Sequence, residues 1–243
     1  MNVGMRSFYP IGVLRGVRPF CIPSRMRRLL PLPTILLAAL APPALGAEIY
    51  TDRACYLETA QTTATVRGSG FAPMQPYTAM LDGAPLGNST TNEQGFMQAA
   101  LRPPLLAARE NQHLHTVLVQ ADQTASTTFT VTRFVASFAP TKGDPARLRV
   151  RFSVFGFGLG GGTPDIYVHY VAPGGKPART VRLGRAQGQC GSLARTRLRR
   201  LFPFTPRHGR WRLQFDTSRQ YQRGVKGSPF LFYTVGVTVR SAK

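Results

Sequence analysis

Polar and apolar residues alternate along much of this chain, and a period of two residues is typical of β-strands with one buried face. In the first half, the alternation predicts strands around Thr62–Arg67, Tyr77–Leu81, Phe96–Leu101, His113–Gln120 and Ser126–Arg133. The pair Asp82-Gly83 tolerates positive φ and predicts a tight turn after the second of these strands. No convincing amphipathic helix interrupts the pattern. Several short strands in under 90 residues therefore predict a β-sandwich.

The second half shows the same alternation. Strands are expected around Leu148–Phe152, Ile166–Val171, Arg179–Leu183, Trp211–Phe215 and Phe230–Val239. Pro173-Gly174-Gly175-Lys176 predicts the turn of a hairpin. The segment Ser192–Leu201 fits a strand with three arginines on one face, or a helix that brings Leu198 and Leu201 together. We expect irregular or short-helical structure there. The overall expectation is an all-β protein with two tandem immunoglobulin-like β-sandwich domains, residues 47–133 and 134–243, after an N-terminal signal segment.

Three stretches of the first half resemble a known family. Val66–Pro73 (VRGSGFAP), Leu81–Gly87 (LDGAPLG) and Thr91–Phe96 (TNEQGF) are similar to bacterial immunoglobulin-like modules of the IPT/TIG kind. The resemblance covers roughly residues 62–133. It implies a spacer or binding module on an exported protein, and it carries over no catalytic residues.

The front of the chain has the layout of a secretory signal peptide. Arg25, Arg27 and Arg28 precede the largely apolar run Leu29–Leu40, and small residues follow up to Ala47. We expect cleavage after Gly46 or Ala47 and a secreted or cell-envelope protein, with an uncleaved membrane anchor as the alternative. Met26 could itself start such a peptide, so residues 1–25 could be an overextended reading frame.

Three cysteines are present, and Cys21 would leave with the signal peptide. Cys55 and Cys190 remain, one in each half. In an exported protein they can form one disulfide that ties the halves together, and two isolated buried thiols are the alternative.

Positive charge is concentrated in the second half. Residues 134–243 hold 20 Lys and Arg against three acids, whereas residues 47–133 hold five basic and seven acidic residues. Such an imbalance suits a negatively charged partner, and guanidinium groups grip phosphates and carboxylates through paired hydrogen bonds. We expect one cationic surface for an anionic cell-wall polymer or membrane surface. The candidate anion-binding residues are Arg147, Arg149, Arg151, Arg195, Arg197, Arg199, Arg200, Arg210 and Arg212. The competing interpretation is that the high arginine content reflects a GC-rich genome and that these residues lie on a solvated strand face. No motif supports specific nucleic-acid binding.

Catalytic and cofactor motifs are incomplete. Gln187–Ser192 resembles the stretch before the papain-like nucleophile, but Leu193 stands where that cysteine would fall. Gly156–Gly161 matches a dinucleotide fingerprint without the helix it needs. His113 and His115 point the same way on a strand but lack an evident third metal ligand. We therefore expect no metal, no cofactor and no enzyme. Two alternatives stay open: a wall-acting hydrolase or transferase using Cys190 or a His-centred site, and a module that binds a protein partner through its sheet edges.

Overall fold

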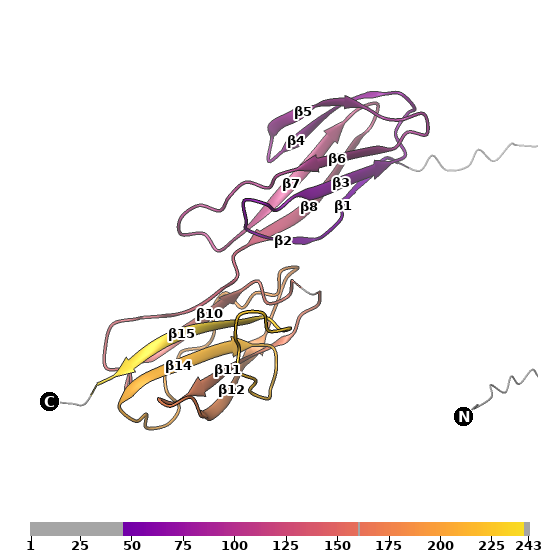
Figure 1. Ribbon diagram of the computed structural model, residues 1–243. Coiled ribbons are helices and arrows are strands. Elements are labelled where there is room, and N and C mark those ends of the chain that lie inside the picture. The colour runs from indigo at the N-terminus through magenta and orange to yellow at the C-terminus, as the bar shows by residue number, and fades with distance from the viewer. Residues whose placement is uncertain (1–45, 160, 241–243) are drawn as a thin grey trace, which may run out of the picture. The chain divides into compact units, whose positions relative to one another are not determined.

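The computed structural model describes residues 46–159 and 161–240. All regular secondary structure within these ranges is β-strand (Figure 1). The expected all-β fold class is therefore confirmed. The expected signal segment, residues 1–46, falls outside this range except for Gly46. Across the described ranges, no helical stretch has the length and apolarity needed to span a bilayer.

The first half contains eight strands in two sheets. One sheet has the order β1-β3-β6 and the other the order β2-β8-β7-β4-β5. All neighbouring strands are antiparallel except β2, which runs parallel to β8. The strands are β1 (Glu48–Thr51), β2 (Cys55–Leu57), β3 (Ala64–Ser69), β4 (Pro76–Leu81), β5 (Ala84–Thr90), β6 (Met97–Leu101), β7 (Gln112–Gln120) and β8 (Thr124–Thr132).

Both sheets of this half contribute side chains to one core. Val66 of β3 is buried with Val117 of β7 and Phe129 of β8, because alternate residues of each strand face inward. Tyr56 of β2 packs edge-on against Phe129 at a ring-centroid distance of 5.3 Å. Two sheets over a shared core form the arrangement of a β-sandwich.

The described residues of the second half form seven strands, again in two sheets. The smaller sheet has the order β13-β10-β9 and the larger one the order β12-β11-β14-β15. All of their pairings are antiparallel. The strands are β9 (Val135–Ala139), β10 (Arg149–Phe155), β11 (Asp165–Val171), β12 (Pro177–Arg185), β13 (Arg199–Arg200), β14 (Gly209–Asp216) and β15 (Phe232–Val239).

A second core lies between these sheets and is rich in aromatic residues. Phe152 of β10 lies 5.8 Å from Phe215 of β14, measured between ring centroids. The single tryptophan, Trp211, is buried in the same core and packs edge-on against Phe202. Each half therefore has its own hydrophobic core.

Four strands, β1, β2, β5 and β9, were not predicted by the alternation, and the ambiguous segment 192–201 is resolved. All seven residues of β5 are exposed, so no apolar alternation marks this edge strand. The short β9 begins the second half, ahead of the first strand that the alternation predicted there. Residues 192–201 contain no helix, so the helical alternative is wrong, and only Arg199–Arg200 form a regular strand there. The expected turn at Asp82-Gly83 is confirmed, with φ of 51° and 83°.

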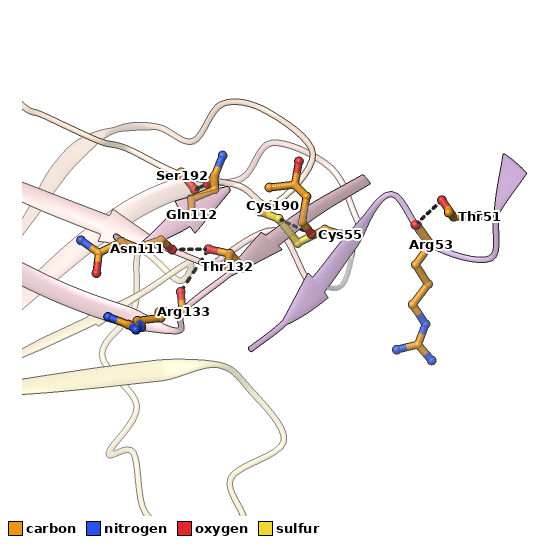
Figure 2. The surroundings of a disulfide bond; sticks show 10 residues. Thr51, Arg53, Cys55, Asn111, Gln112, Thr132, Arg133, Cys190 and Ser192 are labelled. Atoms are coloured by element: carbon orange, nitrogen blue, oxygen red, sulfur yellow. Dashed lines mark hydrogen bonds between the residues drawn. A yellow bond between two sulfur atoms is a disulfide. The ribbon is translucent and has the colours of Figure 1, made fainter. Parts of the chain in front are cut away.

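A disulfide joins the two halves (Figure 2). Cys55 of β2 is bonded to Cys190, which lies 135 residues further along the chain, and their Cα atoms are 5.2 Å apart. The pairing predicted from the cysteine count is confirmed, and the alternative of two isolated thiols is wrong. Beside the bridge, the hydroxyl of Ser192 donates a hydrogen bond to the side-chain oxygen of Gln112.

Candidate functional site

Three of the candidate arginines lie on the outer side of β10 and its neighbour β13. Arg149 and Arg151 alternate with Val150 and Phe152, which are completely buried. Arg200 is the cross-strand partner of Arg149. Directly opposed residues of an antiparallel pair point to the same face, so these side chains share the face that turns away from the core.

Two more arginines are brought to β10 by an irregular segment that runs beside it. The amide of Thr196 donates to the Phe152 carbonyl (2.9 Å), and the Phe152 amide donates to the Thr196 hydroxyl (2.8 Å). Thr196 is buried between Arg195 and Arg197, which are both exposed. We call the following set the β10 face: Arg149, Arg151, Arg195, Arg197 and Arg200.

The nine candidate arginines do not lie on one surface. Arg210 and Arg212 belong to β14, where they alternate with the buried Trp211 and Leu213. These two apolar side chains enter the same core as those of β10, but from the other sheet. Arg210 and Arg212 therefore point out of the opposite side of the sandwich. In addition, Arg212 is half-buried and donates to the hydroxyl of Tyr221 at 2.9 Å.

The remaining two candidates, Arg199 and Arg147, each lie near a group of the protein, although the side chain of Arg147 stays 91% exposed. Arg199 donates to the carbonyls of Arg182 and Leu183 on β12, at 3.3 and 3.4 Å, so it links the two sheets at their edge. Arg147 lies 3.8 Å from the carboxylate of Asp144. The alternation of buried and exposed residues indicated which arginines point away from the core. It did not indicate that Arg199 and Arg147 lie near other groups of the protein.

All three carboxylates of the second half already have partners. Asp144 lies near Arg147, Asp165 pairs with Arg182 at 2.6 Å, and Asp216 contacts a histidine. The hydrogen bond from Arg182 lowers the pKa of Asp165 below its ordinary value. No ion pair reaches the β10 face from any residue that the structure describes, so its charge is uncompensated there.

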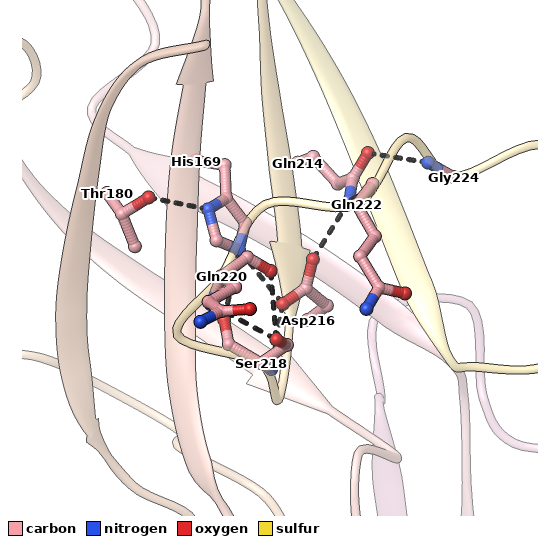
Figure 3. A network of polar contacts seen from close by, with 8 residues as sticks. All are labelled: His169, Thr180, Gln214, Asp216, Ser218, Gln220, Gln222 and Gly224. Carbon is pink, nitrogen blue, oxygen red and sulfur yellow. Dashed lines mark hydrogen bonds and ion pairs between the residues drawn. The ribbon is translucent and has the colours of Figure 1, made fainter.

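A buried polar network lies on the outer side of the larger sheet (Figure 3). Nothing in the residue pattern predicted it. His169 and Asp216 are almost inaccessible and lie 3.0 Å apart. Asp216 also accepts bonds from the side-chain amide of Gln214 (2.9 Å) and from the Ser218 amide (2.9 Å). The network thus connects β11 and β14 with the loop that follows β14.

The network has the components of a hydroxyl–imidazole–carboxylate chain. The Nε2 of His169 lies 3.0 Å from Asp216 and 3.1 Å from the Ser218 carbonyl, so this nitrogen carries the proton. The Nδ1 forms a hydrogen bond with the Thr180 hydroxyl at 2.8 Å. His169 is nevertheless fully buried. The arrangement anchors the loop and offers a substrate no access to the ring.

The loop is fixed at further points by the side-chain amide of Gln214. It donates to the Gln222 carbonyl at 2.7 Å and accepts from the Gly224 amide at 3.1 Å (Figure 3). A buried network in which each member is satisfied stiffens the structure around it. The loop is therefore held against the sheet by these polar contacts.

The thiol version of the enzyme alternative does not fit this geometry. Cys190 is fully buried and its sulfur is bonded to Cys55. The nucleophilic form of cysteine is the thiolate, and a sulfur in an intact disulfide cannot form a thiolate.

A groove of about 1330 Å³ runs between the free edges of β9 and β15. Its wall includes the apolar side chains of Phe138, Tyr233 and Val235, all partly buried. Within the described ranges, β9 pairs only with β10, and β15 pairs only with β14. Two rows of backbone groups therefore border this groove without a neighbouring strand.

Comparison with models of known protein families gives no match, and no curated protein matches the chain in sequence. The functional interpretation therefore depends on the arrangement of the residues themselves.

Proposed function

We propose that this chain is an exported, non-enzymatic binding protein of two immunoglobulin-like domains, whose second domain associates with anionic polymers or lipid head groups of the cell envelope. The strand orders support the domain type. In the first half, β1-β3-β6 and β2-β8-β7-β4-β5 correspond to strands A-B-E and A′-G-F-C-C′ of an immunoglobulin sandwich. The second half has the matching orders E-B-A and C′-C-F-G.

Export is supported by two independent features. The basic flank, apolar run and small residues before Ala47 match a signal peptide. The Cys55–Cys190 disulfide is of a kind that persists in oxidising compartments and is rare in the cytosol. An envelope location would also bring the basic half close to wall polymers and lipid head groups.

The uncompensated charge of the β10 face is the observation that carries the binding proposal. Arg149, Arg195, Arg197 and Arg200 are exposed, and Arg151 is half-exposed. Guanidinium groups present several donors in a rigid plane, which suits phosphate, sulfate and carboxylate groups repeated along a polymer. Binding of this type is multivalent, needs no deep pocket and weakens as salt competes for the same groups.

The test compares two variants with the same loss of charge. The first replaces Arg149, Arg195, Arg197 and Arg200 on the β10 face with Gln. The matched control also loses four exposed arginines of the second half, which donate no side-chain hydrogen bond to the described residues: Arg207, Arg219, Arg223 and Arg240. The probes are soluble polyphosphate and vesicles containing phosphatidylglycerol, assayed by titration calorimetry and co-sedimentation.

We expect the first variant to lose most of its affinity and the control to lose much less. With four contacts to a flexible polyanion, a threefold rise in salt should weaken wild-type binding by about 20-fold. Equal losses in both variants would show that net charge, not the β10 face, governs binding. Binding that is insensitive to salt would reject the electrostatic mechanism.

The groove between β9 and β15 favours a second candidate, a module for a protein partner. In the first half, β2 covers the edge of β8, whereas the corresponding edge of β15 is bare in the described part of the chain. An extended peptide can add itself to such an edge as a further strand. Arg147, His208 and Arg240 border the groove against the single acid Asp144, which favours a peptide of alternating apolar and acidic residues.

A synthetic peptide of alternating Val and Glu residues tests this candidate by fluorescence anisotropy. Val235→Glu places a negative charge on the groove wall and should weaken peptide binding at least tenfold. The four-arginine variant of the β10 face should bind the peptide as the wild type does. A peptide that binds wild type and Val235→Glu equally well would eliminate the groove as its site.

A further inference from the structure

Three side chains of types that bind metal ions, one aspartate and two histidines, meet at one end of the first half. His113 and His115 are two residues apart on β7 and therefore point to the same side. Asp82 comes from the turn between β4 and β5. Its donor atom and one from each histidine lie within 4.8 Å of one another.

The turn that carries Asp82 is locked beside β7 by backbone contacts. The Asp82 amide donates to the Thr116 carbonyl at 2.9 Å, and the Thr116 amide donates to the Asp82 carboxylate at 2.8 Å. Asp82 has a φ of 51°, a left-handed conformation that Asp tolerates better than most residues. The carboxylate is thus positioned by the fold, which explains why no third ligand was evident from the residue pattern.

Each histidine is oriented by a carboxylate. The Nδ1 of His115 lies 2.6 Å from Asp82, and the Nδ1 of His113 lies 2.7 Å from Glu110. The two imidazole rings are neighbours, with centroids 4.6 Å apart. Glu110 holds the Nδ1 of His113 and leaves its Nε2 with a lone pair, a recurrent feature of histidines that bind metals. Asp82 instead faces the Nδ1 of His115, where an ion would take the place of the shared proton.

One ring nitrogen at this place has no partner in the fold. His115 is only 4% exposed, and its Nε2 is buried without a hydrogen bond to any described atom. Buried polar atoms are nearly always satisfied, so an exception calls for an unseen partner such as a water or an ion. This nitrogen points away from the Nδ1 that faces Asp82, so the proposed site is defined by the three clustered side chains rather than by this nitrogen.

We propose that Asp82, His113 and His115 bind a divalent transition-metal ion of the zinc type, with Glu110 as a supporting carboxylate. Two imidazoles and a carboxylate are a ligand set that suits Zn²⁺, whereas Mg²⁺ and Ca²⁺ prefer oxygen alone. Donor atoms about 2.1 Å from one ion are at most about 4.2 Å apart. The cluster therefore needs to close by at most roughly half an ångström, which the exposed side chain of His113 can do.

The site is tested by titrating ZnCl₂ into the untagged full chain by calorimetry, at a pH near 7.5. The chain carries Cys21→Ser, because the other two cysteines are bonded to each other and a free thiol would bind zinc on its own. We expect one zinc ion per chain and a zinc-dependent rise in the melting temperature. His113→Ala should weaken binding at least tenfold and abolish the rise.

A matched control and a second ligand variant complete the test. His208→Ala removes an exposed histidine from the second half and should leave zinc binding unchanged. Asp82→Asn keeps a residue that accepts positive φ and should weaken binding at least tenfold, so the result does not depend on His115 variants that could fail to fold. Zinc binding that is absent from the wild type, or equally strong in His113→Ala and Asp82→Asn, overturns the proposal.

Discussion

A methyl group added at Gly191 is expected to disrupt the second half. Gly191 has a φ of 63°, and a Cβ there would lie 2.2 Å from the backbone nitrogen of Gly158. The two segments are held together by bonds from the Gly158 amide to the Cys190 carbonyl (2.9 Å) and from the Phe157 amide to the Gly191 carbonyl (3.1 Å). The atoms nearest to this Cβ all belong to the backbone of Gly158 and Phe157, so the chain itself must move to admit the methyl group.

The cost follows from those two bonds. A buried backbone group left without its partner loses about 1–3 kcal/mol, and a left-handed conformation costs a residue with a Cβ about 1 kcal/mol more. Gly191→Ala should therefore lower the free energy of unfolding by about 4 kcal/mol. Gly188→Ala is the matched control, since its φ is 69° but no atom lies within 4 Å of the added Cβ. It should cost about 1 kcal/mol.

Urea unfolding followed by tryptophan fluorescence measures both values. Trp211 is the only tryptophan and is buried in the second core, so its emission reports on this half. Both variants are compared in the oxidised state. Losses that agree within about 1 kcal/mol would refute the conclusion that close approach of the two backbones, rather than φ alone, requires glycine at position 191.

Two further changes test the bridge and a salt bridge of the first half. Replacing Cys55 and Cys190 with Ala removes a crosslink across 135 residues, which should lower the free energy of unfolding by up to about 5 kcal/mol when both cores unfold together. An unfolding midpoint in urea that does not change would contradict this. Arg133 donates to Glu58 at 2.7 Å and holds the pKa of Glu58 below its ordinary value of 4.5. A depressed folded-state pKa means stability that is fully present above pH 4.5 and lost as the pH falls through the folded value. Glu58→Gln should therefore cost about 2 kcal/mol at pH 7 and flatten the decline in acid, checked by urea unfolding between pH 3 and 7.

Local patterns predicted much of the fold but not its edges. Strands with one buried face, such as β7 and β10, show a period of two residues, and this signal is contained within the strand. The edge strand β5 is exposed at all seven positions, so nothing in its composition distinguishes it from a loop. Its existence depends on hydrogen bonds with β4, which a single sequence does not display.

The candidate sites were predicted less well because they depend on how strands combine. The alternation showed that the side chains of Arg149 and Arg210 both point away from a core. It did not show that the two residues belong to different sheets. His113 and His115 were visible as a pair on one strand. Asp82 joins them only because the turn after β4 lies beside β7, and that neighbourhood is a property of the sheet order.

The two halves are joined twice, by the main chain near Phe134 and by the sulfur bridge between Cys55 and Cys190. A protease that severed the chain at that junction would produce two polypeptides and release neither of them. Dissociation would require a reductant as well as the cut. A protein built in this way keeps its two modules together in surroundings where hydrolytic enzymes are abundant and free thiols are scarce.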